Sequence, residues 1–216
     1  MPLTSRIRVP VVTNANFTIT EGGIIINNTD ETNHPIFLQN EATVWDDLTV
    51  PVNATKLGGS KDPTYAKFKD NGAASQGVFA YSFPDPGVET ELYFTAQLSH
   101  KYKEGTDIYA HVHWSPSSAG AGNVAWGLEY TWTNINEVFP DTSITITPIA
   151  ADGVANKQQL GSIVTIDGTG KKISSMLDCR IFRSATGDTY SDGAWLHEID
   201  FHFQVDTIGS RQLVIK

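Results

Sequence analysis

The sequence predicts an all-β fold, an antiparallel two-sheet sandwich arranged as a jelly roll and preceded by an extended N-terminal arm. Three observations support this prediction. Apolar and polar residues alternate with period two in most segments, turn residues separate these segments, and no helical periodicity of similar strength competes. The 18 glycines and 10 prolines are typical of a turn-rich β protein.

Residues 123–134 show the alternation most clearly. One parity carries large apolar or aromatic side chains, namely Val124, Trp126, Leu128, Tyr130 and Trp132. The other parity is small or polar, and it consists of Ala125, Gly127, Glu129, Thr131 and Thr133. Because successive side chains of a strand point to opposite faces, one face of this segment is predicted to be interior and the other exposed.

Eight further strands are expected from similar patterns, near 44–52, 77–83, 91–98, 107–114, 142–149, 160–166, 174–184 and 194–207. Turn sequences such as Pro84–Gly87 and Asp167–Gly170 separate them. Residues 53–76 contain Gly58-Gly59, Pro63 and Gly72 and are expected to form a long exposed loop. The core is predicted to include Trp126, Leu128, Trp132, Phe201 and Phe203.

The chain is expected to divide into an extended arm over residues 1–42 and a sandwich domain over residues 43–216. The arm is rich in asparagine, and Gly22-Gly23 and His34-Pro35 interrupt any long element. Its apolar patches, Val9–Val12 and Ile24–Ile26, are too small to form a core and leave room for two short strands at most. Such a segment is expected to lie on a partner.

Charge and composition restrict the class of partner. The formal net charge is −9, and an acidic surface repels phosphates, so nucleic-acid binding is not expected. No apolar stretch approaches the roughly 18 residues of a membrane span, and the N-terminus lacks the apolar region of a secretory signal, so folding in a cytoplasm is expected. Cys179 is the single cysteine; it cannot form the cysteine pair of an immunoglobulin-type sandwich and is expected to be a buried thiol.

The sharpest chemical motif is Gly105 followed by His111-Val112-His113. This spacing resembles the start of the cupin metal motif, and on a strand the two histidines point the same way. Residues of one parity on the last strand could complete a metal site, namely Glu198, Asp200 and His202.

The resemblance to cupins ends after the second histidine. Cupins continue with a glutamate, whereas this chain continues with Trp114 and Ser115, and the second cupin motif is absent. The parity of the histidines also opposes that of the predicted core. We therefore expect a polar outer face or subunit interface whose histidines bond to carboxylates on neighbouring strands, with no metal and no cofactor. The alternative is a cupin-like metalloenzyme with His111, His113 and His202 as metal ligands.

No catalytic residue is predicted. A Gly-x-Ser-x-Gly elbow is absent. The adjacent acids Asp46 and Asp47 could resemble a glycosidase pair, but neighbours in a strand face opposite ways, so a solvated turn is expected. A carbohydrate-binding module would instead need an exposed aromatic groove, and the candidate stacking residues are Trp45, Tyr65, Tyr190 and Trp195.

The region from residue 44 to residue 211 resembles a family of uncharacterised structural proteins encoded by tailed bacteriophages. The segments that carry the resemblance are Val44–Leu48, Lys56–Lys61, Glu91–His100, Tyr102–Asp107, His111–Trp114, Trp126–Trp132, Ile173–Met176, Cys179–Arg183 and Asp206–Arg211. The arm lies outside it. The resemblance brings no catalytic assignment, and it implies a non-enzymatic virion protein.

The resemblance and the arm together lead to a specific expectation. The chain would be a capsid decoration or cement protein on the exterior of the particle, assembled as a homotrimer, with the arm contacting the major capsid protein or another virion protein. The alternatives are a tail- or fibre-associated adaptor and a receptor- or carbohydrate-binding module of the virion. No nucleic-acid or membrane partner is expected.

Overall fold

The computed structural model describes residues 16–20, 23–27, 44–85, 87, 89–210 and 212–216. Apart from one turn of 3-10 helix, η2 (Val52–Ala54), the elements in these ranges are strands, which confirms the all-β prediction. The strands of the main body are β3 (Val44–Pro51), β4 (Thr64–Lys69), β5 (Val78–Phe83), β6 (Thr90–Gln97), β7 (Ile108–Pro116), β8 (Asn123–Thr133), β9 (Ser143–Ala150), β10 (Gln159–Ile166), β11 (Met176–Arg183) and β12 (Ala194–Val205). Within these ranges, no helix has the length and apolar character needed to cross a membrane.

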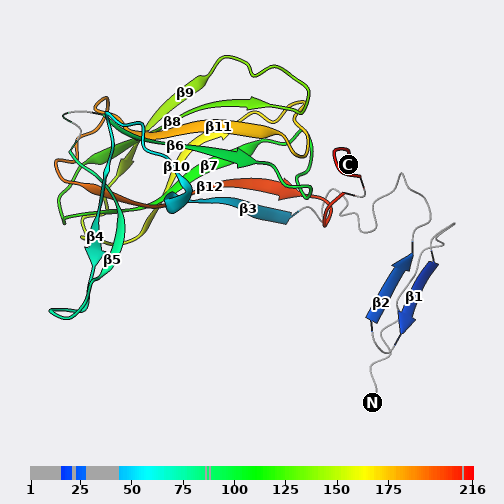
Figure 1. Cartoon of the computed structure of the whole chain (residues 1–216), viewed down its shortest axis with the longest axis horizontal. Coiled ribbons are helices and arrows are strands. Elements are labelled where there is room, and N and C mark those ends of the chain that lie inside the picture. The colour runs from blue at the N-terminus through cyan, green and yellow to red at the C-terminus, as the bar shows by residue number, and fades with distance from the viewer. Residues whose placement is uncertain (1–15, 21–22, 28–43, 86, 88, 211) are drawn as a thin grey trace.

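Eight of the strands form a jelly roll (Figure 1). Their antiparallel pairs are nested along the chain: β3 pairs with β12, β6 with β11, β7 with β10, and β8 with β9. Strand β12 also pairs with β7, and β11 pairs with β8. The result is two antiparallel sheets, ordered β3-β12-β7-β10 and β6-β11-β8-β9, packed face to face as predicted.

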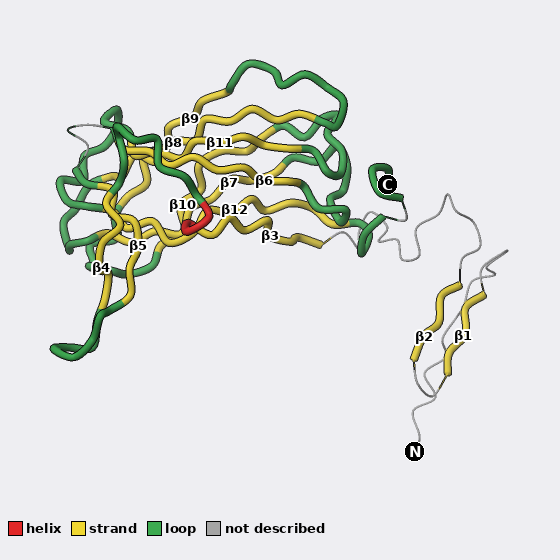
Figure 2. Tube along the Cα trace, in the orientation of Figure 1, coloured by secondary structure: helices red, strands yellow, loops and turns green. Residues whose placement is uncertain are grey.

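A hairpin of β4 and β5 is inserted between the first and second jelly-roll strands and projects from the sandwich (Figure 2). Strand β5 pairs with Ala194–Leu196 of β12, on the edge where β3 pairs with Glu198–Val205. A register shift between Leu196 and Glu198 separates the two halves of β12. The prediction of a loop over residues 53–76 was wrong here, because β4 has no buried face and its alternation carries no core signal.

The interior between the sheets is filled by aromatic and aliphatic side chains. Trp114 of β7 and Trp126 of β8 are fully buried and meet edge to face, with ring centroids 6.2 Å apart. Phe94 and Phe201 face each other across the sheets at 6.2 Å. The five residues predicted for the core are all buried, and so is Cys179.

Arg183, the last residue of β11, fixes several loops at one end of the sandwich. It is fully buried and forms an ion pair with buried Asp188, with nitrogen–oxygen distances of 2.8 and 2.9 Å. It also donates to the backbone carbonyls of Phe83, Pro84, Tyr190 and Asp192. The guanidinium therefore joins three separate chain segments.

Within the predicted arm, the structure describes one hairpin, formed by β1 (Asn16–Thr20) and β2 (Gly23–Asn27). Both strands pair only with each other among the described strands, and Figure 1 shows them apart from the sandwich. The patch Ile24–Ile26 lies in β2. The patch Val9–Val12 lies outside the described residues.

Candidate functional site

With the inserted hairpin, the sheet of β3, β12, β7 and β10 has six strands, since β5 pairs with β12 and β4 with β5. The outer face of this six-stranded sheet carries a cluster of histidine and aspartate side chains. Its origin is the parity of β7 and β12, whose apolar positions point into the sandwich. The register pairs Asp200 with His111 and His202 with Tyr109, which brings the two strands' polar side chains together. The sequence-based prediction of a polar outer face is confirmed for these histidines.

Three members of this cluster approach one another closely. The rings of His111 and His202 have centroids 4.2 Å apart. Nε2 of His202 lies 2.9 Å from Oδ2 of Asp200 and 3.1 Å from Oδ1 of Asp47 on β3. One potential ligand atom from each of His111, Asp200 and His202 lies within 4.8 Å of the other two.

His113 stands beside this group and is held by a separate contact. The side-chain amide of Gln158 donates to Nδ1 of His113 at 2.8 Å. With Nδ1 acting as acceptor, the ring proton of a neutral His113 sits on Nε2, which lies 3.8 Å from Oδ1 of Asp200. His113 therefore directs a polar N–H toward the central carboxylate.

Burial and incomplete pairing distinguish His111 and Asp200 from the other members. His111 is 9% exposed and Asp200 is 2% exposed. Burial and the nearby His202 lower the pKa of His111, so its neutral imidazole is favoured at neutral pH. Nδ1 of His111 and Oδ1 of Asp200 are buried without a hydrogen-bond partner among the described residues.

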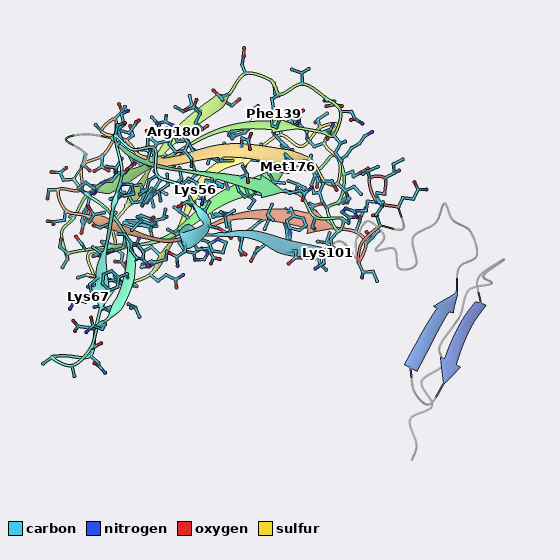
Figure 3. All side chains as sticks on the ribbon, in the orientation of Figure 1. Lys56, Lys67, Lys101, Phe139, Met176 and Arg180 are labelled. Atoms are coloured by element: carbon cyan, nitrogen blue, oxygen red, sulfur yellow. The ribbon has the colours of Figure 1, made fainter. Side chains whose placement is uncertain are left out.

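A groove of about 740 Å³ lies over the outer face of the other sheet. Arg180 of β11, which is labelled in Figure 3, lines this groove. Its guanidinium contacts the carboxylates of Glu89, Glu91 and Glu129 at 2.8, 2.6 and 2.9 Å. The hydroxyl of Tyr93 donates to Glu91 at 2.9 Å. The lining combines charged side chains such as Arg180 and Glu129 with apolar surface, which suits an amphipathic ligand or a protein contact.

The two polar surfaces belong to different sheets, which the sequence did not indicate. Tyr93, Gln97 and Glu129 have the polar parity of their strands, as His111 and His113 do. The first three lie on strands of the β6-β11-β8-β9 sheet, whereas the histidines lie on the opposite side of the sandwich. Alternation gives the face of a residue within its strand, but the assignment of strands to sheets depends on long-range pairing.

The adjacent acids Asp46 and Asp47 lie within β3, so the expected solvated turn was wrong. They do point in opposite directions. Asp46 pairs with Lys101 at 3.1 Å, and Asp47 pairs with His202. Two carboxylates on opposite faces of one strand cannot act together on a glycosidic bond.

The candidate sugar-stacking residues have different environments. Trp45 on β3 is 54% exposed and Tyr65 on β4 is 51% exposed. Trp195 is half-buried, with its ring centroid 5.3 Å from that of Phe68. Tyr190 is buried and its hydroxyl bonds to Ser118, so it cannot stack on a bound sugar.

A serine–histidine pair also occurs on the outer side of the six-stranded sheet. Oγ of Ser115 lies 2.8 Å from Nε2 of His197. Ser115 is fully buried, so its hydroxyl is inaccessible to a substrate carbonyl. The contact joins β7 to β12 at the register shift and is structural.

Two groups of polar residues were not found from the sequence. Arg180 meets Glu129 because β11 and β8 are paired in that register. Asp47 meets His202 because β3 pairs with β12, more than 150 positions later. An ion pair between strands so far apart in the sequence can be recognised only after the strand pairing is known.

Comparison with known proteins finds no matching family model and no matching curated protein. Similar solved structures include the N-terminal CBM22-1–GH10 modules of Clostridium thermocellum endo-1,4-beta-D-xylanase 10B, at 10% identity over 77% of this chain and 29% of that chain, with a TM-score of 0.40. A structure of infectious bursal disease virus, Gx strain, matches at 11% identity over 92% of this chain and 37% of that chain, with a TM-score of 0.37.

A third similar structure is the enzymatically active domain of tailspike protein 4 of bacteriophage CBA120, at 9% identity over 73% of this chain and 19% of that chain, with a TM-score of 0.36. The chain spans less than half of each of these three proteins. Identities of this order transfer no activity to this chain.

Proposed function

We propose that the chain is a non-enzymatic structural protein of a tailed-bacteriophage virion, a decoration or cement protein on the exterior of the capsid. The observation that carries the proposal is a jelly roll whose interior is filled by side chains and whose first strand is preceded by a separate segment. Large residues such as Trp114, Trp126 and Phe201 occupy the interior where a cupin would hold its metal. Because the interior is filled, we expect the function to lie on the outer surfaces of the sandwich and in the arm.

The sequence resemblance over residues 44–211 supports the virion assignment, since it covers the jelly roll and leaves out the arm. The net charge of −9 is consistent with an exterior position, away from packaged DNA. The arm would contact the major capsid protein or a neighbouring virion protein, with β-strand addition as one available mode.

Exposed apolar side chains on the sandwich support contact with other proteins. Val78 and Phe79 of the projecting hairpin are exposed, and Tyr65 packs beside Phe79 at a centroid distance of 5.7 Å. The C-terminal residues Leu213–Ile215 are also exposed. Apolar surface of this kind is stabilised by burial against a partner, and we propose a homotrimer as the assembled form.

The test is incorporation of an arm-deleted protein into particles. Deletion of residues 1–40 should leave the purified sandwich folded, with an unchanged melting temperature, but absent from particles that otherwise assemble. A full-length variant with Ile24, Ile25 and Ile26 changed to serine should show the same loss. Particles carrying either protein at normal occupancy would place attachment in the sandwich, and particles that lack even the full-length chain would contradict the proposal.

A receptor- or carbohydrate-binding role in the virion is the second candidate. The observation that favours it is the groove of about 740 Å³, whose lining includes Arg180, Glu129 and the exposed Tyr93. Binding of a glycan from the host surface, lost in Tyr93→Ala and kept in Tyr65→Ala, would support this role. Equal binding by both variants would exclude the groove as its site.

A further inference from the structure

We propose that His111, Asp200 and His202 bind one divalent transition-metal ion, of the class to which zinc belongs, on the outer face of the six-stranded sheet. The three side chains come from two adjacent strands, β7 and β12, and their potential ligand atoms lie within 4.8 Å of one another. The proposal concerns a different surface from the attachment arm, so it holds or fails independently of the virion role.

The donor set suits this class of metal. Two imidazoles and one carboxylate are the protein ligands of many zinc sites, and imidazole also binds cobalt, nickel and copper. Bonds of about 2.0–2.2 Å place the ligands of a tetrahedral ion roughly 3.3–3.5 Å apart. The observed separations of up to 4.8 Å therefore require only small side-chain rotations.

Two buried polar atoms lack a hydrogen-bond partner, which points to a missing ligand. Nδ1 of His111 and Oδ1 of Asp200 are buried and have no hydrogen-bond partner among the described residues. Both residues are more than nine-tenths buried. Buried polar atoms are nearly always paired, so an orphaned nitrogen and an orphaned carboxylate oxygen within one small cluster require an explanation. A metal ion bound by the imidazole of His111 and the carboxylate of Asp200 would supply a partner to both side chains.

The hydrogen-bonded outer face expected from the sequence explains only part of the cluster. It accounts for His202, which contacts Asp200 and Asp47, and for His113, which is held by Gln158. It gives no hydrogen-bond partner to Nδ1 of His111. The neighbouring rings of His111 and His202, whose planes are inclined by 40°, would instead share one ion, and the proton of Nε2 of His202 would be released on binding.

The surroundings provide the supporting contacts that metal sites use. Asp47 lies 3.1 Å from Nε2 of His202 and is available as a fourth ligand from β3. His113 directs its Nε2 toward Oδ1 of Asp200 and would orient that carboxylate. A bound ion would then link β7, β12 and β3. It would fasten the edge strand β3, which begins where the arm ends.

The experiment uses the untagged full-length protein, stripped of metal with a chelator and titrated with Co²⁺ and then with Zn²⁺. We expect Co²⁺ to bind at one per chain with visible d–d absorption, and Zn²⁺ to displace it and raise the melting temperature by several degrees. His111→Gln and His202→Gln should each weaken binding by at least about 10-fold. His100→Gln, which changes a histidine bonded to Ser174 and Ser210, should bind as the parent protein does.

The parent titration decides the question even if a variant fails to fold. Absence of one-per-chain binding at micromolar Co²⁺ and Zn²⁺ would overturn the proposal. Binding that survives in a folded His111→Gln, His202→Gln double variant would also overturn it, because the ion would then lie elsewhere.

Discussion

The buried pair of Arg183 and Asp188 provides the sharpest test of how the sandwich is held together. We predict that Arg183→Met lowers the free energy of unfolding by about 3–5 kcal/mol. Methionine fills a similar volume but has no charge, so Asp188 becomes an uncompensated buried carboxylate. The backbone carbonyls of Phe83, Pro84 and Tyr190 lose their donor as well.

The magnitude can be checked by urea denaturation followed by tryptophan fluorescence, and by thermal unfolding. For a domain of this size, about 2–4 °C is lost per kcal/mol, so the melting temperature should fall by roughly 6–20 °C. The control is Lys157→Met, which removes the exposed ion pair with Asp152 and should leave the melting temperature close to that of the parent protein.

A second variant distinguishes the cost of the buried charge on Asp188 from the cost of the hydrogen bonds lost with Arg183. Asp188→Asn in the Arg183→Met background should recover part of the loss, because the buried site then holds no charge. The amide oxygen can still accept from the backbone of Ala125 or Tyr190. If Arg183→Met is no more destabilising than Lys157→Met, the reasoning about this buried ion pair is refuted.

Two further predictions concern the interior. Phe201→Ala should destabilise the protein by about 3–5 kcal/mol in urea unfolding, whereas Phe79→Ala on the exposed hairpin should have an effect below about 1 kcal/mol; similar losses would show that Phe201 is not a core residue. Burial raises the pKa of Tyr102 to about 12. Above the ordinary value near 10, the unfolded chain releases this proton while the folded protein retains it, so stability should fall as pH rises from about 10 to about 12. Tyr102→Phe should make this decline shallower, and an unchanged slope would contradict the assignment.

Much of the fold follows from the sequence because each jelly-roll strand has one buried face. The alternation around Trp126, Leu128 and Phe201 correctly indicated the interior, and the histidines of β7 lie on the outer face as parity required. Strand β4 was missed because it projects with its partner β5 and buries neither face.

The candidate site was only partly predictable. The sequence indicated that His111 and His113 share a face and that Asp200 and His202 share another strand's parity. It could not show that β7 and β12 are neighbours in the register that pairs His111 with Asp200 and brings the ring of His202 close to that of His111. For the same reason the contacts between Arg180 and its three glutamates were not predicted, because the pairing of distant strands depends on the whole sandwich.

We propose that this jelly roll is an exterior component of a phage particle, and electron cryomicroscopy of the purified virion can locate it. We predict density for the two-sheet sandwich on the outer surface of the capsid, in groups of three, with the N-terminal segment lying on a neighbouring subunit. Density for the chain inside the shell, or virions that lack the chain, would contradict the proposed role.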